Sequence, residues 1–265
     1  MIKILYIKHM DILNKLDIKQ LTEEWTDPNK PYPYIVIDNF FTDEVSKEFA
    51  NSYPELDDKR WYHFRDSIHG KKNVFEQGMM GISNVADLPI YALSIIAKLN
   101  SPEFLNILKQ ITNIDGLVLD THNEIGQWAG IRAMKPGAYQ SIHSDARLHP
   151  HLGIEKKITL VGYLNEEWKE SDGGYTEVWN DDMSACVDKV APLFNRVLIF
   201  QNTDKSYHGV PEVNNFRKTF LTSYLRNTPD FKETRPKAQF VKRPNESDVD
   251  LWDELSNQRA NLKDY

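Results

Sequence analysis

The sequence predicts a mainly β, α+β fold, in which a helical first half supports a β-sandwich or barrel. Before about residue 116, apolar residues recur at helical spacing and helix start signals precede them. From residue 117 onward, short β-rich runs follow one another and turn residues separate them. Many short strands at this spacing are typical of antiparallel β folds rather than of a parallel α/β sheet.

The first predicted elements are a helix, a strand and a second helix. Residues 11–24 place apolar side chains at near-helical spacing, with Asp11 as the N-cap. Three prolines between positions 28 and 33 then break the chain. The apolar run 34–41 is typical of a buried strand, and Thr42 after it begins a helix with the character of a capping box.

A mixed segment and two helices complete the first half. Residues 57–85 are polar and aromatic with three glycines, so we expect loop with short strands and consider this segment a candidate lid over a site. Residues 88–99 and 101–111 predict two helices. Ser101 supplies the N-cap of the second, and a proline occupies its first helical position.

The second half predicts a series of strands and a tail. Turn signals such as Pro136-Gly137 separate the strands, and Trp252 with its apolar neighbours indicates one more short helix after Thr228. The predicted strand runs are GLVLD, GIRAM, KITLVGYLN, GYTEVW, ACVDKVA, RVLIFQN and TFLTSYLRN. We expect residues 1–265 to form a single domain, with helical support and a lid in 1–116, the β core in 117–228 and a C-terminal tail in 229–265.

Composition limits the classes of function. The 265 residues suffice for one large domain. A net charge of −7 argues against a nucleic-acid surface, which is usually basic. The one cysteine, Cys186, allows no intrachain disulfide and indicates a reducing compartment, and no apolar run approaches the length of a membrane helix. We therefore expect a cytoplasmic protein that acts on a small-molecule or peptidyl substrate, with no nucleic-acid or membrane partner.

Three residues form a candidate metal site, namely His143, Asp145 and His208. Residues two apart on extended backbone project to the same side, so His143 and Asp145 can reach one ion. His208 follows the apolar run RVLIF and returns from a distant strand. Two imidazoles and one carboxylate leave three positions of an octahedral ion open, as in non-haem Fe(II) oxygenases, although these ligand types also suit Mn(II), Co(II), Ni(II) or Zn(II).

Two other sites in the chain carry a similar triplet. His9-Met10-Asp11 lies near the start of the sequence with no strand after it, and His122-Asn123-Glu124 precedes the first core strand. Only His143-Ser144-Asp145 lies between a Pro-Gly turn and the first long strand of the β series. We select it for that context.

An ordered set of motifs extends beyond the metal triplet. The stretches are PYPYIVIDNFFTDEVSKEF, KPGAYQSIHSD, ITLVGYLNEEW, SDGGYTEVWNDD, PLFNRVLIFQNTDKSYHGVPEV and NFRKTFLTSYLRN. Together they resemble the 2-oxoglutarate/Fe(II)-dependent oxygenases, in particular the prolyl-4-hydroxylase-like branch. That resemblance covers most of the chain and implies a double-stranded β-helix, a cupin-like jelly roll, as the core.

The resemblance also implies the parts of the site. His143, Asp145 and His208 match the iron ligands. Arg217 matches the basic residue that pairs with the distal carboxylate of 2-oxoglutarate, and Tyr163 matches a position that often donates a hydroxyl to the same carboxylate. The implied cofactors are Fe(II), 2-oxoglutarate and O2, with ascorbate as a supporting reductant.

The implied reaction is hydroxylation of an unactivated C–H in an amino-acid, peptidyl or small-metabolite substrate, with succinate and CO2 as co-products. Because Asp145 stands where related halogenases have a small residue, we expect hydroxylation rather than chlorination. Lys218 is the alternative 2-oxoglutarate anchor if the strand register differs by one.

Four residues near the metal triplet are candidate substrate contacts. Arg147 and His149 follow Asp145 on a loop, and Trp128 and Arg132 flank the first core strand. Side chains of these types are also common in solvated loops and in packing. Two alternative functions are a cupin-type metal-binding protein without oxygenase activity, which needs no 2-oxoglutarate anchor, and a catalytically weak oxygen-sensing or interaction protein.

Overall fold

Antiparallel strands form the framework of the protein. The computed structural model describes residues 11–118, 129–149, 152–228, 237–245 and 247–261. The strands are Tyr34–Ile37 (β1), Tyr62–His63 (β2), Ser67–Ile68 (β3), Lys71–Lys72 (β4), Glu76–Ile82 (β5), Leu117–Val118 (β6), Ala129–Ser144 (β7), Glu155–Tyr163 (β8), Thr176–Trp179 (β9), Cys186–Val190 (β10), Val197–Gln201 (β11), His208–Val210 (β12), Arg217–Arg226 (β13) and Gln239–Phe240 (β14).

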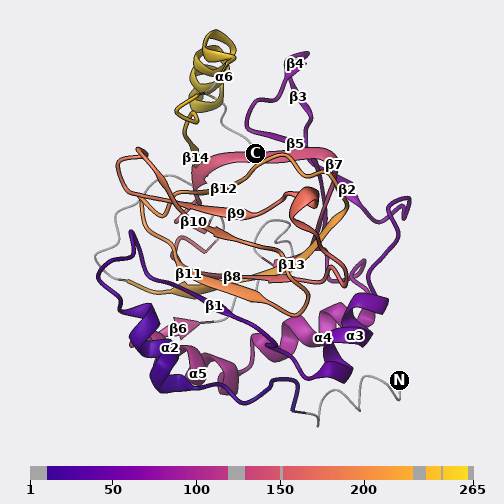
Figure 1. Cartoon of the computed structure of the whole chain (residues 1–265), viewed down its shortest axis with the longest axis vertical. Helices are drawn as coiled ribbons and strands as arrows, with labels where there is room; N and C mark the ends of the chain where they lie inside the picture. The colour runs from indigo at the N-terminus through magenta and orange to yellow at the C-terminus, as the bar shows by residue number, and fades with distance from the viewer. Residues whose placement is uncertain (1–10, 119–128, 150–151, 229–236, 246, 262–265) are drawn as a thin grey trace.

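One twelve-stranded sheet curves into a nearly closed barrel (Figure 1). Its main path runs β1-β11-β8-β13-β7-β12-β9-β10, and of the strands in the described residues only β3 and β4 lie outside the sheet. The sixteen-residue strand β7 belongs to both halves of the barrel, because its first part pairs with β13 and its second part with β12. This double-stranded β-helix confirms the predicted mainly β, α+β fold with a jelly-roll core.

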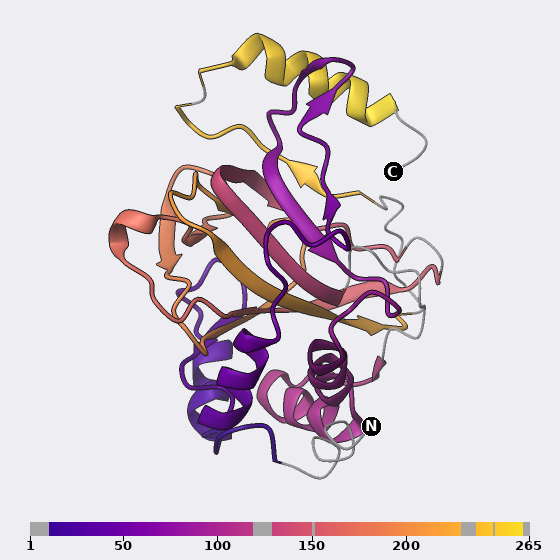
Figure 2. The same cartoon turned by 90° about the vertical axis from the view of Figure 1, so that its right-hand side faces the viewer.

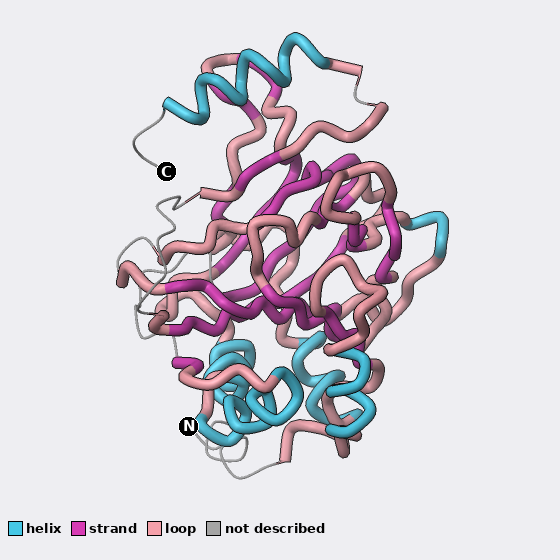
Figure 3. Tube along the Cα trace, turned by 90° about the vertical axis from the view of Figure 1, so that its left-hand side faces the viewer, coloured by secondary structure: helices cyan, strands magenta, loops and turns pink. Residues whose placement is uncertain are grey.

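Helices cover the outer face of the β1-β11-β8-β13 half. They are Ile18–Trp25 (α2), Asp43–Asn51 (α3), Ile90–Leu99 (α4) and Pro102–Thr112 (α5), while Val249–Asn261 (α6) lies at the opposite end of the barrel (Figures 1 and 3). No helix in the described ranges combines the length and apolarity that crossing a bilayer requires.

Alternation along β13 separates the helix-facing core from the barrel interior. Phe220 packs against Phe41 and Phe49 on the helical side, with ring centroids 5.7 and 5.0 Å away. The Tyr224 hydroxyl donates to the Leu99 carbonyl, 3.0 Å away at the end of α4. Arg217, three residues from Phe220, therefore faces the interior of the barrel.

The prediction for the first helix is wrong at its start. Helix α2 begins at Ile18, and Asp17 is its N-cap because the Asp17 carboxylate accepts from the backbone of Gln20 at 3.1 Å. The residues before it form no helix, and Leu13 forms a β-bridge with Phe41. Pairing with the strand region outweighs the helical spacing of this segment.

The predicted capping box at Thr42 is also absent. Thr42 is the N-cap of α3, but its side chain makes no capping hydrogen bond. A capping box needs Glu or Gln three residues later to reach back to the N-cap, and Val45 occupies that position. The predicted N-cap at Ser101 is confirmed, since its hydroxyl accepts from the Phe104 backbone at 3.3 Å.

Two segments outside the predicted core strands are part of the barrel wall. Residues 76–82 lie within the segment predicted as loop with short strands, and they form β5, which pairs with β7. Pro136-Gly137, predicted as a turn, lies inside β7. The β5–β7 register shifts between Gln77 and Met79, and Gly137 adopts a φ of 84°. A bulge of this kind lets one long strand pass through a Pro-Gly pair.

The C-terminal segment, residues 237–245 and 247–257, lies at the end of the molecule opposite helices α2 to α5 (Figure 2). Within it, β14 pairs with the end of β7. The ring of Phe75 lies 5.0 Å from Phe240 and 4.9 Å from Trp252, and Lys71 of the β3–β4 hairpin makes an ion pair with Glu254. These contacts attach α6 to the hairpin and confirm the predicted last helix.

Gly162 offers a test of the packing between β8 and the helical side. A Cβ built at this position would overlap the Phe220 ring. We expect Gly162→Ala to lower the free energy of unfolding by about 1–3 kcal/mol, the usual effect of overpacking. Urea unfolding measures it. In a Phe220→Leu background the penalty of Gly162→Ala should shrink, and an unchanged penalty there would trace the effect to the backbone instead.

Candidate metal centre

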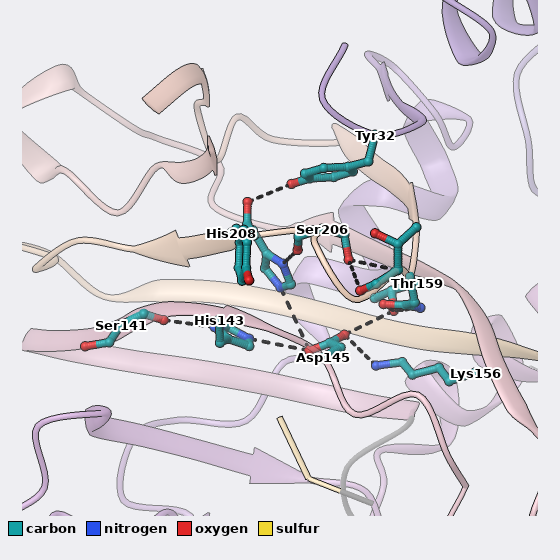
Figure 4. A network of polar contacts seen from close by, with 11 residues as sticks. Tyr32, Ser141, His143, Asp145, Lys156, Thr159, Ser206 and His208 are labelled. Atoms are coloured by element: carbon teal, nitrogen blue, oxygen red, sulfur yellow. Dashed lines mark hydrogen bonds and ion pairs between the residues drawn. The ribbon is translucent and has the colours of Figure 1, made fainter. Parts of the chain in front are cut away.

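Three polar side chains, from His143, Asp145 and His208, point toward one another at one site (Figure 4). His143 and His208 lie opposite each other on β7 and β12, and their ring centroids are 4.3 Å apart. Asp145 follows the end of β7, and its Oδ1 lies 3.4 Å from His143 Nε2 and 3.9 Å from His208 Nε2. One ligand atom from each residue lies within 4.8 Å of the others, so the three can hold a single ion.

Backbone carbonyls orient both imidazoles. Nδ1 of His143 lies 2.9 Å from the Ser141 carbonyl, and Nδ1 of His208 lies 2.9 Å from the Ser206 carbonyl. A carbonyl only accepts, so Nδ1 carries the proton and the Nε2 lone pair points toward Asp145. Burial, with the neighbouring His143, lowers the pKa of His208 to about 4. His208 is therefore neutral at neutral pH, as a metal ligand must be.

The carboxylate of Asp145 is ionised although it is largely shielded from solvent. Burial acts to raise its pKa, but the charge of Lys156 and the neighbouring His143 outweigh that effect and hold the pKa well below its usual value. Lys156 Nζ lies 2.6 Å from Oδ2, and Thr159 Oγ1 lies 3.4 Å from the same oxygen. Two imidazoles and one carboxylate fit a divalent transition metal with open coordination positions.

A second polar cluster lies on the same inner wall. The buried Arg217 guanidinium donates from Nε to the Gly174 carbonyl at 2.9 Å and from Nη2 to Thr176 Oγ1 at 3.0 Å. It also lies 5.3 Å from the centre of the Tyr163 ring, and the Tyr163 hydroxyl is 2.8 Å from Thr176 Oγ1. Within the described ranges no carboxylate forms an ion pair with Arg217, so its charge can serve an anionic ligand.

The alternative anchor faces the other way. Lys218 Nζ lies over the rings of Tyr53 and Phe216, 5.6 and 5.8 Å from their centres, on the outer side of β13. Arg217 and Lys218 alternate, so of these two cations only Arg217 faces the cluster with Tyr163.

The comparison with protein families decides the class of this site. Residues 129–226 match the model of the 2OG-Fe(II) oxygenase superfamily. The matched segment, which runs from β7 to β13, is similar to the oxygenase domains of that superfamily. The matched segment contains the His143–Asp145–His208 cluster and Arg217. The protein is thus a 2-oxoglutarate-dependent dioxygenase, and Fe(II), 2-oxoglutarate and O2 are its cofactors.

Solved structures agree with the fold of the oxygenase. A prolyl-4-hydroxylase from Pseudomonas putida is 16% identical with a TM-score of 0.54, covering 80% of this chain and 99% of its own. A Trichoplax adhaerens prolyl hydroxylase, in complex with a hypoxia inducible factor peptide fragment, is 14% identical with a TM-score of 0.58, covering 80% and 91%. A Burkholderia pseudomallei oxidoreductase of the 2OG-Fe(II) oxygenase family is 14% identical with a TM-score of 0.52, covering 82% and 97%. Among curated proteins, none matches the sequence.

The candidate substrate residues of the oxygenase have different surroundings. Arg147 bridges Glu155 and Asp204 at 2.8 and 2.9 Å, and His149 is buried, with Nδ1 accepting from the Leu152 backbone at 3.1 Å. These contacts lie within or beside the loop that carries both residues. A substrate would therefore compete for Arg147 with two carboxylates.

Arg132 lies on β7, two residues from Met134, whose sulfur contacts the Arg217 guanidinium. Burial lowers the pKa of Arg132 to about 10, and its guanidinium lies 5.8 Å from the centre of the Phe64 ring. Trp128 lies outside the described residues. The same holds for the competing triplet His122-Asn123-Glu124, and for His9 and Met10 of the other triplet.

Two residues beside the metal cluster are missed by the sequence prediction. Lys156 is two residues from Ile158, which packs on the helical side, so regular strand alternation predicts that Lys156 faces the helices as well. No local sequence signal indicates that it contacts Asp145. Phe240 packs on the imidazole of His143, with ring centroids 5.1 Å apart. It comes from the tail, almost a hundred residues after His143, so no motif links the two.

Proposed function

We propose that this oxygenase hydroxylates an unactivated C–H of an amino-acid, peptidyl or small-metabolite substrate and releases succinate and CO2. The observation that carries the proposal is the pairing of two features on one inner wall. The His143–Asp145–His208 cluster can hold iron, and the buried Arg217 is available for the distal carboxylate of 2-oxoglutarate.

In this proposal His143, Asp145 and His208 bind Fe(II) on one face. The orientation of both imidazoles supports this role, because the carbonyls of Ser141 and Ser206 bind Nδ1 and leave Nε2 to face the metal position. Bound iron and 2-oxoglutarate together activate O2 for attack on an otherwise inert C–H bond. The chain contributes ligand geometry and a buried site that excludes water.

Arg217 and Tyr163 hold the co-substrate in the same proposal. A guanidinium offers two parallel N–H donors to a carboxylate, and burial strengthens such a pair because water does not screen it. Thr176 links the two residues, since its hydroxyl contacts both Arg217 and Tyr163. These hydrogen bonds hold the Arg217 and Tyr163 side chains in place before 2-oxoglutarate binds.

We further propose that the substrate is held near the loop after Asp145 and the first part of β7, where Arg147, His149 and Arg132 lie, and we keep Trp128, outside the described residues, as a candidate contact from the sequence alone. The peptide complex of the Trichoplax enzyme supports a peptidyl substrate as one option within this class. We also propose that residues 1–265 act as one domain. The direct packing of Phe41 and Phe49 on Phe220 of β13 supports this arrangement.

Succinate release tests the proposed function. The purified protein should convert 2-oxoglutarate to succinate only when Fe(II) and O2 are both present, and a screen of amino acids, peptides and small metabolites should yield one that gains 16 Da and stimulates succinate release. A cupin-type protein without oxygenase activity would bind the metal and form no succinate under any of these conditions. That result would contradict the proposal.

A further inference from the structure

The two oxygens of Asp145 have separate surroundings. Oδ1 faces the two imidazoles, at 3.4 Å from His143 Nε2 and 3.9 Å from His208 Nε2. Oδ2 faces two donors instead, Lys156 Nζ at 2.6 Å and Thr159 Oγ1 at 3.4 Å. Figure 4 shows Lys156 and Thr159 reaching Asp145 from the side away from the histidines. One oxygen is thus directed to the metal position, and the other is held by the protein.

A β-bulge directs Lys156 into the site. Lys156 and Thr159 are three residues apart on β8, so regular alternation would send their side chains to opposite faces. The β8–β13 register shifts at this point, because Tyr224 pairs with Ile158 while the next residue, Leu225, pairs with Lys156. The extra residue on β8 is Lys157, and it turns Lys156 to the same face as Thr159.

The lysine is built into the wall. Lys156 is only 6% exposed, and its backbone N–H donates to the Arg147 carbonyl at 2.7 Å. Thr159 is fixed in turn by Asn202, whose side-chain amide donates to its hydroxyl at 3.0 Å. Burying an ammonium group costs free energy unless the group is paired with an opposite charge. The ion pair with Asp145 offsets that cost for Lys156.

We propose that Lys156 is a positioning residue that restricts Asp145 to binding the metal through Oδ1 alone. An octahedral ion held by two imidazoles and one carboxylate oxygen keeps three positions for other ligands. If Oδ2 also bound, one of those positions would be lost. With 2-oxoglutarate occupying two, the position left for O2 depends on Oδ2 being held away. This inference rests on the proposed metal ligands.

Water relaxation by Mn(II) measures the open positions without any turnover. Mn(II) in the wild-type protein should carry three exchanging waters, and in Lys156→Met it should carry two, so the inner-sphere relaxivity should fall by about one third. Anaerobic addition of 2-oxoglutarate should leave one water on the wild-type ion and none in Lys156→Met. The variant's relaxivity should then drop to the outer-sphere level.

Two further variants control this experiment. Lys157→Met removes the adjacent lysine, which pairs with Glu155 at 3.2 Å, and should keep the wild-type relaxivity. Lys156→Arg keeps a charged donor and should restore three waters. Lys156→Leu replaces Lys156→Met if the latter does not fold.

The outcomes separate this inference from the proposed function. Wild-type protein that binds no Mn(II) would overturn the metal site itself and the inference with it. Wild-type protein that binds Mn(II), with Lys156→Met retaining the same number of waters, would overturn only the role of Lys156.

Discussion

Replacing His208 with alanine should reduce succinate formation from 2-oxoglutarate to background. His208 supplies one of only two imidazoles, and the remaining pair of His143 and Asp145 cannot hold one face of an octahedral ion. Changing residues that merely support a ligand typically weakens metal binding by about 10–100-fold. Removing a ligand should exceed that, so the Mn(II) dissociation constant should rise by more than about 100-fold. Calorimetric titration with Mn(II) and a succinate assay measure the two effects.

His63→Ala is the matched control, because His63 lies exposed on β2 and outside the cluster. It should leave both metal binding and turnover at wild-type values. Melting curves of both variants without metal establish that they are folded. Turnover that survives in folded His208→Ala would refute the assignment of His208 as a ligand.

The second large effect is expected for Arg217→Ala. Truncating one partner of a buried, hydrogen-bonded charge pair costs about 2 kcal/mol or more. The 2-oxoglutarate concentration for half-maximal succinate formation should therefore rise by about 30-fold or more. Iron binding should be preserved, since Arg217 contacts Gly174, Thr176 and Tyr163 rather than the metal cluster.

Lys218→Ala provides the comparison on the neighbouring residue. Its ammonium lies over Tyr53 and Phe216 on the outer side of β13, so the 2-oxoglutarate requirement should stay within about twofold of wild type, the range of a surface change. If the two variants exchanged their effects, Lys218 would be the anchor and the placement of Arg217 would be structural.

The strands of the core were predictable because burial on one or both faces leaves a strong local pattern. The runs at β8, β11 and β13 each carry that pattern, and each forms a strand. The start of α2 was not predictable in the same way. Residues 11–17 have helical spacing, but the chain there pairs with the region of Phe41 through Leu13. Such tertiary pairing leaves no trace in a local window.

In the candidate metal site, too, local patterns predict some residues and tertiary pairing determines the others. His143 and Asp145 form a short motif with a defined spacing, and His208 follows a recognisable strand, so residue type and order locate all three. Lys156 depends on a bulge that sequence alternation misassigns. Phe240 depends on pairing between β14 and β7, and Pro136-Gly137 is read as a turn although the bulge keeps it within β7.

The position of Phe240 has a consequence for how the enzyme matures. During synthesis, His143 and Asp145 leave the ribosome well before His208, and Phe240, which flanks His143, follows later still. The nascent chain therefore carries two of its three candidate ligands before the third exists, and His143 still lacks the ring of Phe240 that packs against it. Iron acquisition should accordingly be a late event, completed only once the tail has been translated and has closed against the barrel.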